Sequence, residues 1–512
     1  MVAGVSLLIA LQLFSRLVTF ALNAALARSL GPKWYALGNV QLQLVSASAL
    51  FLAKEGVRRA CQRIYPGGRG PALGRAVNLA WAAVPLTALS GAAVAATSAR
   101  VLGDAEGLVS AAELRWAVWT VCAAAVLEAA AEPLWLYAQA NEGLLSRRVI
   151  AEGAALALKA ALTAWLALRV GAGAAAFAYA QLAFAGAFGA LLLALLRRAR
   201  APLRELLPRR RGAALEGDER ALAAQVLWQC AQKYALTEGE RLVIVALTGM
   251  TEQGVYALVS NLGSLVARLV LQPVEEATFA HYSRLAAAAP PDAAALRRMV
   301  ALVRAAAIFG GVFAAFGPAY SWLLLRLLYG PLWSSTDAPA VLQAYCAHVC
   351  AIALNGVTEA FVHATATRDE LQKLNVLLVA LSVAYVPAAA VGLTTFGARG
   401  LIAANCANVA LRTAYSLRFI RRRVDGAAAK EDGGAAEVRM LPHPAVLGAL
   451  AASAAATLGA GAWVGGGDSL GPRHAVHVLC GGGCLVGVAL AVYRCEPELA
   501  AQLRALRRKK SV

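Results

Sequence analysis

Apolar stretches of about 20 residues recur along almost the whole of this 512-residue chain, with only short breaks between them. A stretch of that length is what an α-helix needs to cross a lipid bilayer. The composition agrees, since 60% of the residues are hydrophobic, 15% are charged and the mean hydropathy is +0.61. We therefore expect an all-α polytopic membrane protein with no soluble domain between its spans.

The apolar pattern predicts about fourteen transmembrane helices. The first stretch carries Arg16 near its middle and has no basic leader, so we interpret it as a retained helix and not as a signal peptide. The predicted spans are residues 5–27, 36–53, 76–97, 114–136, 150–169, 174–196, 223–247, 253–272, 300–325, 339–362, 371–394, 398–419, 444–464 and 474–492.

The basic residues predict the orientation of these spans. The net charge is +19, and most of the 48 Lys and Arg residues fall on one set of alternating loops and on the C-terminal tail. By the positive-inside rule those loops face the cytosol, which places both termini there. The nine cysteines include no CxxC pair, so we expect buried apolar side chains and neither metal nor redox chemistry.

A faint internal repeat predicts two pseudo-symmetric six-helix lobes followed by two further helices. Tyr-Ala-Leu occurs at residues 35–37 and again at 256–258, and at the same offset Glu55 meets Glu276. Six is an even number, so the halves share one orientation and are related by an axis along the membrane normal. The predicted domains are an N-lobe (1–196, helices 1–6), a basic cytosolic linker (197–221), a C-lobe (222–420, helices 7–12), a cytosolic loop (421–443), helices 13 and 14 (444–493) and a basic cytosolic tail (494–512).

Charged residues inside the spans are the candidate substrate-binding groups. Each costs at least about 2.5–3.5 kcal/mol at the centre of a membrane, so such groups normally face a cavity or a partner. Arginine forks match phosphate oxygens, and cations along a cleft between the lobes would suit a diphosphate. The candidates are Arg16, Lys159, Lys233, Arg241, Arg268 and Arg412.

Structural ion pairs remain the alternative for every one of these cations. Glu152 and Lys159 are seven residues apart on one helical face, and Glu238 and Arg241 are three apart. Arg304 lies near the start of a span, so we expect it to extend to the membrane interface.

Residues 52–59, at the end of the second span, are a candidate gate. Glu55 and Glu276 occupy equivalent ends of helices 2 and 8 and could pair with basic residues of the opposite lobe, which would act as a rocking switch. An ordinary positive-inside anchor is the alternative. The candidates for a gating or structural role are Glu55, Arg58, Arg59, Glu276, Glu240 and Glu359.

Signatures of enzymes are missing from the sequence. It contains no GxxxxGK[ST], no HExxH and no GxSxG motif. We therefore expect a protein that is not an enzyme and that binds no cofactor and no metal.

Several strings resemble the Rft family of endoplasmic reticulum membrane proteins. They include Leu-Val-Thr-Phe-Ala-Leu-Asn at 17–23, Thr-Glu-Gly-Glu-Arg at 237–241, residues 261–276, and Asn-Gly-Val-Thr-Glu-Ala-Phe at 355–361, in family order over nearly the whole chain. The resemblance implies the fold of the multidrug/oligosaccharidyl-lipid/polysaccharide exporters. It also implies residence in the endoplasmic reticulum and a role in N-glycosylation, with a dolichol-diphosphate oligosaccharide as ligand. A role carries over to Arg16, Arg58, Lys159, Arg268 and Glu276.

Three functional hypotheses stay open. The first is a flippase that moves the mannose-rich glycolipid from the cytosolic to the lumenal leaflet by alternating access. The second is a non-transporting binding protein or chaperone that delivers the same lipid to lumenal enzymes. The third is a drug or ion antiporter of similar fold. The expected partners are the dolichol-linked oligosaccharide, membrane lipids and the N-glycosylation machinery, and we expect no nucleic acid.

The last residues of the sequence bear on location. Lys509 and Lys510 resemble the dilysine retrieval signal of endoplasmic reticulum membrane proteins, which a receptor reads on a cytosolic tail. A basic tail that only follows the positive-inside rule is the alternative.

Overall fold

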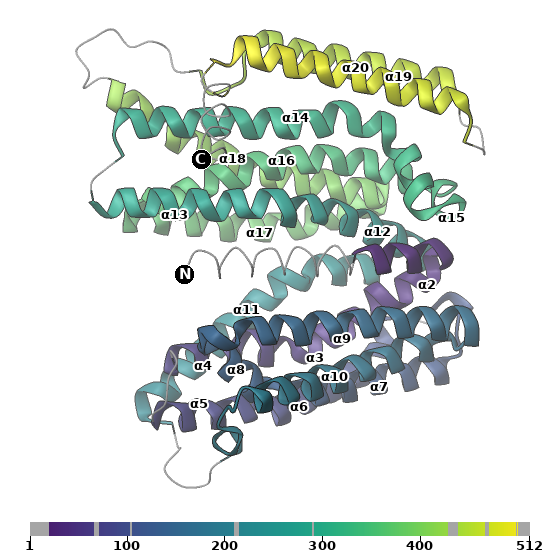
Figure 1. Ribbon diagram of the computed structural model, residues 1–512, viewed down its shortest axis with the longest axis vertical. Coiled ribbons are helices and arrows are strands. Elements are labelled where there is room, and N and C mark those ends of the chain that lie inside the picture. The colour runs from purple at the N-terminus through teal and green to yellow at the C-terminus, as the bar shows by residue number, and fades with distance from the viewer. Residues whose placement is uncertain are drawn as a thin grey trace. The chain divides into compact units, whose positions relative to one another are not determined.

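The computed structural model describes residues 20–65, 71–102, 105–208, 215–288, 291–428, 439–465, 470–497 and residue 499 (Figure 1). All regular structure within these ranges is helical, and they contain no β-strand. The prediction of an all-α protein is therefore confirmed. Contacts divide the chain into two compact units, Met1–Ala257 and Leu258–Val512.

Residues 20–29 are helical and precede the numbered elements. The elements up to residue 247 are α2 (Pro32–Ala36), η1 (Leu37–Gln41), α3 (Leu42–Phe51), η2 (Leu52–Val57), α4 (Arg58–Ile64), α5 (Pro71–Trp81), α6 (Ala83–Val101), η3 (Ala105–Gly107), α7 (Ala111–Ala129), α8 (Glu132–Ala140), η4 (Glu142–Leu144), α9 (Leu145–Trp165), η5 (Leu166–Val170), α10 (Gly173–Arg198), η6 (Leu203–Leu206) and α11 (Gly217–Leu247). From residue 250 they are α12 (Met250–Val266), η7 (Ala267–Leu271), α13 (Gln272–Ala288), α14 (Ala293–Tyr329), α15 (Pro331–Ser334), α16 (Ala338–Thr365), α17 (Arg368–Phe396), α18 (Ala398–Ala428), α19 (Pro444–Val464) and α20 (Pro472–Cys495).

Within the described residues, ten helices are long and apolar enough to cross a membrane, and α7 with α8 makes an eleventh if that bent pair is one span. The 42° bend between α7 and α8 lies just before a proline in the first turn of α8, where the ring removes a backbone donor. Two further predicted spans form the 31-residue helices α11 and α18, which carry more charge than the other spans. Most of the first predicted span lies outside the described residues. The protein crosses the membrane many times, and the count of fourteen stays a prediction.

In the first unit, α7 packs against α3, α6 and α10, and α9 packs against α10. The α11 helix packs on η2 and α4, at the end of the second predicted span. Gly56 allows this approach, because a Cβ there would lie 2.6 Å from the side chain of Leu227 on α11. The helix predicted to begin the C-lobe therefore packs inside the first unit, and the lobe boundaries, which rest on the sequence repeat, stay a prediction.

In the second unit, α16 is the central helix and packs against α13, α14 and α18. The α17 helix packs on α18, and its other faces carry exposed valines, as suits a helix that faces lipid. The hairpin of α19 and α20 packs along α14 (Figure 1). Among the described residues, the two C-terminal helices thus make their main contacts to this unit through α14.

Candidate functional site

Two ion pairs join the end of the second span to the fourth span inside the first unit. Lys54 Nζ lies 2.5 Å from Glu128 Oε1, and Arg58 donates from Nε and Nη2 to the two carboxylate oxygens of Glu132, at 2.6 and 2.7 Å. Both carboxylates are buried. Lys54 lies in the π-helical segment η2, a local widening of the helix that often occurs at functional sites. The two cations are four residues apart in the sequence, and so are the two acids. The two ion pairs therefore lie one helical turn apart.

A third layer continues these two pairs toward the beginning of α9. The guanidinium carbon of Arg58 lies 4.0 Å from the centre of the Trp135 ring, and that of Arg148 lies 5.3 Å from it. Arg148 Nη1 also lies 3.5 Å from Glu152 Oε2, a long contact for an ion pair. The Arg148 side chain is only 15% exposed, although sequence reasoning assigned it to a cytosolic loop.

Lys159 is the last cation of this region. It lies on the α9 face that also carries Glu152, and its Nζ is 6.0 Å from the centre of the Phe184 ring. Within the described residues, no carboxylate lies within ion-pair distance of it, and Glu152 is paired with Arg148 instead. We name Lys54, Arg58, Glu128, Glu132, Trp135, Arg148, Glu152 and Lys159 the charge ladder.

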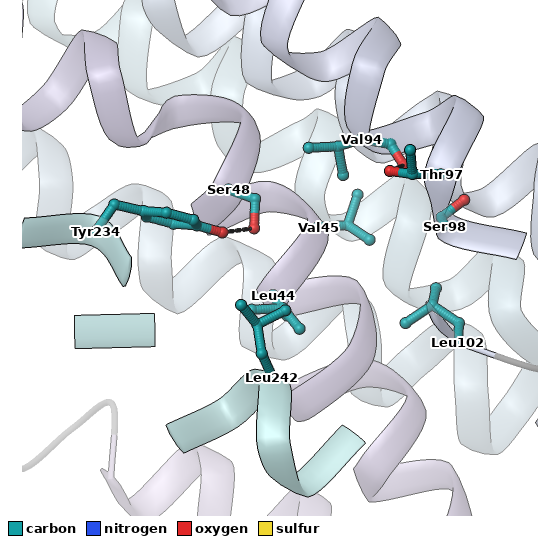
Figure 2. Close-up of a pocket in the computed structure, with 9 residues that line it drawn as sticks. All are labelled: Leu44, Val45, Ser48, Val94, Thr97, Ser98, Leu102, Tyr234 and Leu242. Carbon is teal, nitrogen blue, oxygen red and sulfur yellow. Dashed lines mark hydrogen bonds between the residues drawn. The ribbon is translucent and has the colours of Figure 1, made fainter. Parts of the chain in front are cut away.

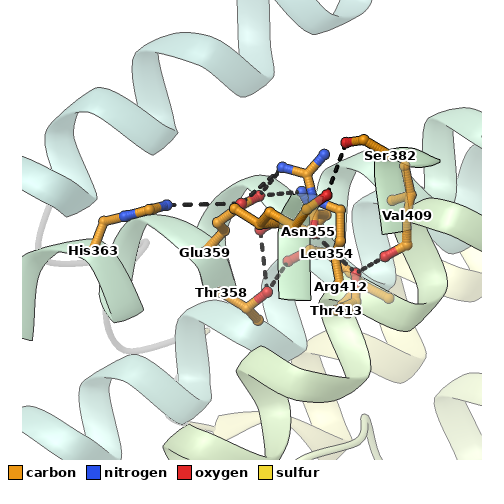
Figure 3. Close-up of polar contacts among 10 residues, drawn as sticks. Leu354, Asn355, Thr358, Glu359, His363, Ser382, Val409, Arg412 and Thr413 are labelled. Atoms are coloured by element: carbon orange, nitrogen blue, oxygen red, sulfur yellow. Dashed lines mark hydrogen bonds and ion pairs between the residues drawn. The ribbon is translucent and has the colours of Figure 1, made fainter. Parts of the chain in front are cut away.

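A second, partly buried polar network lies in the second unit, between α16 and α18 (Figure 3). Arg412 Nη2 donates to both oxygens of Glu359, at 2.7 Å each, and Asn355 Nδ2 donates to Glu359 Oε2 at 2.7 Å. His363 Nε2 lies 3.7 Å from Glu359 Oε1. The Thr413 hydroxyl contacts Asn355 Oδ1 at 3.4 Å. Arg412 and Glu359, predicted separately as a binding and a gating residue, therefore form one ion pair.

The two networks distribute their charges differently. In the first unit, the second span supplies the cations Lys54 and Arg58 and the fourth span supplies the acids. In the second unit, Arg412 on α18 is the cation and Glu359 on α16 is the acid. Glu275 on α13 adds a further carboxylate, which reaches over Gly356 of α16. The two networks thus differ in which helices supply the cations and which supply the acids.

The remaining predicted gate residues make short-range contacts. Arg59 Nη2 lies 2.7 Å from Glu55 Oε2, and Gln272 Nε2 donates to Glu276 Oε1 at 2.8 Å. Each contact joins residues four positions apart on one helix. Pairing across the lobes stays a prediction.

The other predicted binding residues are only partly covered by the structure. Arg241 on α11 and Arg268 on η7 are both exposed. Lys233 and Glu240 lie on α11, but their side chains are outside the described set, as is that of Glu238. Arg16, Lys509 and Lys510 lie outside the described residues altogether.

A cavity of about 170 Å³ lies in the first unit among α3, α6 and α11 (Figure 2). Its wall contains the hydroxyls of Ser48 and Tyr234, which bond to each other, and those of Thr97 and Ser98, which donate to carbonyls of their own helix. Because these hydroxyls have partners, the interior of the cavity is effectively apolar. It is therefore a different kind of site from the charge ladder.

A short loop between α6 and α7 is fixed to the start of α12. Glu106 accepts a hydrogen bond of 2.7 Å from the backbone N–H of Met250 and lies 2.9 Å from Lys33 Nζ. These two contacts lower the pKa of the Glu106 carboxyl, with the Lys33 hydrogen bond contributing most. Glu106 has a left-handed backbone with φ of 49°. Gly249 makes room for it, because a Cβ there would lie 2.6 Å from the carboxylate.

Arg304, which we expected to extend to the membrane interface, forms an ion pair inside the second unit, and the position of that pair relative to the interface stays a prediction. Its Nη1 donates to Glu496 Oε2 at 2.9 Å, and Glu496 is fully buried. Glu496 also accepts a hydrogen bond of 2.8 Å from the His443 backbone. The partner of this arginine is thus an acid 192 residues away in the sequence.

Solved structures with similar architecture define the class of protein. A structure titled "Lipid II flippase MurJ, inward closed conformation" aligns with a TM-score of 0.63 over 95% of this chain and 99% of that one, at 9% identity. An inward-facing multidrug resistance MATE family transporter of the MOP superfamily aligns at 0.57 over 81% of this chain and 96% of that one, at 15% identity. The protein is thus a multi-pass membrane protein with the fold of these transporters.

Sequence comparison defines the family within that class. The chain belongs to the Rft family, whose sequence profile, described as "Rft protein", matches residues 1–505. A Xenopus tropicalis relative named "Man(5)GlcNAc(2)-PP-dolichol translocation protein RFT1" is 31% identical over 472 residues, which are 87% of this chain and 86% of the relative. A Mus musculus relative of the same name is 33% identical over 440 residues, 80% of each chain. The Saccharomyces cerevisiae relative is 25% identical over 481 residues, 82% of each chain.

Proposed function

We propose that this protein moves a dolichol-diphosphate-linked, mannose-rich oligosaccharide from the cytosolic to the lumenal leaflet of the endoplasmic reticulum membrane, for protein N-glycosylation. The observation that carries the proposal is membership of the Rft family, in which relatives that align over most of this chain are named as translocation proteins of Man(5)GlcNAc(2)-PP-dolichol. Both termini would lie in the cytosol, in agreement with the positive-inside rule.

The chemistry of the charge ladder supports such a substrate. A diphosphate is a compact, multiply charged group that must leave water to cross a bilayer, and buried arginine and lysine side chains can replace part of its hydration. The ladder offers four cations against three carboxylates, so one positive charge is in excess before any ligand arrives. The polyprenyl tail has no such need, because the lipid itself is its solvent.

The fold supports movement of the substrate as well as binding. Two compact helical units are the architecture that alternating access requires, because one unit can rock against the other around a bound substrate. With no nucleotide-binding motif in the sequence, the movement would run down the concentration gradient of the lipid or be coupled to an ion.

Reconstitution of the purified protein into vesicles tests the proposal. A short dolichyl-diphosphate glycolipid is included, and an enzyme added outside modifies only the molecules in the outer leaflet. We expect the protein to raise the fraction of glycolipid that the added enzyme can modify from about half to nearly all. Over the same time, that fraction should not change in protein-free vesicles. Binding of the glycolipid without any transbilayer movement would instead support the non-transporting carrier and contradict the proposal.

A further inference from the structure

We propose that Arg148, held against Trp135 beside Arg58, is the first contact for the lipid-linked diphosphate at one end of the charge ladder. This inference rests on the proposed function and adds the place where the charged group binds and the residue that binds it. The ligand chemistry is a phosphate group carried by a membrane lipid, and the source we commit to is the diphosphate of the dolichol-linked substrate.

The position of Arg148 fits a phosphate at the surface of the membrane. It lies in the first turn of α9, whose apolar span extends from Leu145 to Val170. Its neighbour Trp135 lies on α8 and is buried, so its ring forms an inner wall against which the guanidinium of Arg148 is held. A group bound here would stand at the boundary where lipid phosphates reside.

The hydrogen bonds of Arg148 leave capacity for a ligand. Its Nε is buried and has no acceptor among the described residues, and its single ion-pair contact, to Glu152, is 3.5 Å long. The Glu152 side chain is 46% exposed and can therefore turn away at low cost. By contrast, Arg58 already has two short bonds to a buried carboxylate. Arg148 is thus the arginine of the ladder whose donors an incoming phosphate can use.

Trp135 explains why the geometry favours an arginine. Two guanidinium groups lie within 4.0 and 5.3 Å of one indole ring, and the ring quadrupole partly offsets their mutual repulsion. A stacked guanidinium keeps its edge free, and that edge carries the fork of donors that binds phosphate oxygens in pairs. An anion between Arg148 and Arg58 would remove the remaining repulsion, so the site is prepared for negative charge.

Arg147 supplies a matched control. It precedes Arg148 in the same helical turn and is similarly half-buried, but it makes no ion pair or cation–π contact within the described set. The full-length protein is placed in phosphatidylcholine nanodiscs with radiolabelled dolichyl diphosphate that carries two N-acetylglucosamine residues. We expect Arg148→Gln to weaken equilibrium binding at least tenfold and Arg147→Gln to change it less than twofold. Equal effects of the two variants, or unchanged binding in Arg148→Gln, would overturn the inference.

Two further variants separate binding from damage to the fold. Glu152→Gln removes the carboxylate that competes for Arg148, so it should tighten binding severalfold, a gain that a disrupted structure would not produce. Arg148→Lys keeps the charge but loses the fork and the stacking, and it should lie between wild type and Arg148→Gln. If Glu152→Gln binds the glycolipid no more tightly than wild type, and Arg148→Lys binds it as tightly as wild type, Arg148 does not contact the phosphate.

Competition identifies the source of the phosphate. Phosphatidic acid, added at the same mole fraction as the glycolipid, should displace little of it. Displacement equal to that by unlabelled glycolipid would make this a general headgroup site and overturn our assignment. Failure of the inference is distinguishable from failure of the proposed function. If only the inference fails, Arg148→Gln binds and moves the glycolipid as wild type does. If only the proposed function fails, binding depends on Arg148 but wild-type protein moves no glycolipid across the vesicle membrane.

Discussion

Arg58 and Glu132 form a two-bond ion pair between segments 74 residues apart, with Nε to Oε2 at 2.6 Å and Nη2 to Oε1 at 2.7 Å. Glu132 is 3% exposed, so the pair closes the second span against the fourth in a medium that screens charge poorly. The two residues act as one structural group. Neither can be changed alone without leaving a buried charge.

Glu132→Gln should therefore lower the unfolding free energy by about 3–5 kcal/mol, the usual cost of breaking a buried pair from one side. Thermal unfolding in detergent measures it. Arg59→Gln is the control, because the Arg59–Glu55 pair is half exposed and should contribute less than about 1 kcal/mol. The double reversal Arg58→Glu with Glu132→Arg should recover part of the loss. A Glu132→Gln protein as stable as Arg59→Gln would contradict this account.

Arg412 and Glu359 allow their structural and transport roles to be separated. In Arg412→Gln, Glu359 keeps Asn355 and His363 as its partners among the described residues but loses its arginine, so stability should fall. Adding Glu359→Gln removes the unpaired charge and should restore most of that stability. If Arg412 also contacts the diphosphate, glycolipid movement should stay low in the double variant. Thermal unfolding measures stability and the vesicle assay measures glycolipid movement on the same preparations. Recovery of both stability and glycolipid movement in the double variant would mean that Arg412 only pairs with Glu359.

Glu106 should give the protein an acid-sensitive component of stability. Its carboxyl pKa is lowered by Lys33 and by the Met250 N–H, so the charged form is the one that stabilises the fold. That contribution is present above the pKa of the unfolded chain and is lost as pH falls through the lower folded value. Between pH 6 and pH 3, the melting temperature of wild type should fall further than that of Glu106→Gln. Identical pH profiles for the two proteins would exclude this linkage.

Glu496 should hold the C-terminal hairpin on α14. Glu496→Ala leaves Arg304 and the His443 N–H without their acceptor, and hydrogen exchange should rise in α19 and α20 while the first unit stays as protected as in wild type. Glu496→Gln keeps an acceptor for His443 and should have a smaller effect. Exchange that rises equally throughout the chain would point to global destabilisation.

The sequence alone was sufficient to predict the class of fold. An apolar stretch long enough to span the membrane must form a helix there, because its backbone N–H and C=O groups have no water to bond to. The sequence also identified Glu359 and Arg412 as costly intramembrane charges. Their pairing could not be predicted, since partners 53 residues apart on different helices leave no local signal. For Glu152 the partner is Arg148, four residues before it, and not Lys159, seven after it.

Arg148 was missed for a different reason. Two adjacent arginines before an apolar stretch look like a positive-inside anchor, and residue 148 fell just outside the predicted span. A signal was present in the spacing, because Arg148 and Glu152 share one helical face and Trp135 follows Glu132 by three residues. Only the packing of α8 on α9 shows that these two faces meet.

The central claim is specific movement of the glycolipid, and one measurement tests it most directly. Vesicles containing the purified protein carry a dolichyl-diphosphate glycolipid and a labelled phosphatidylcholine, and the transbilayer movement of both is followed in the same sample. We predict that the rate for the glycolipid rises in proportion to the amount of protein, while the rate for phosphatidylcholine stays at that of protein-free vesicles. No acceleration of the glycolipid, or equal acceleration of both lipids, would contradict the account.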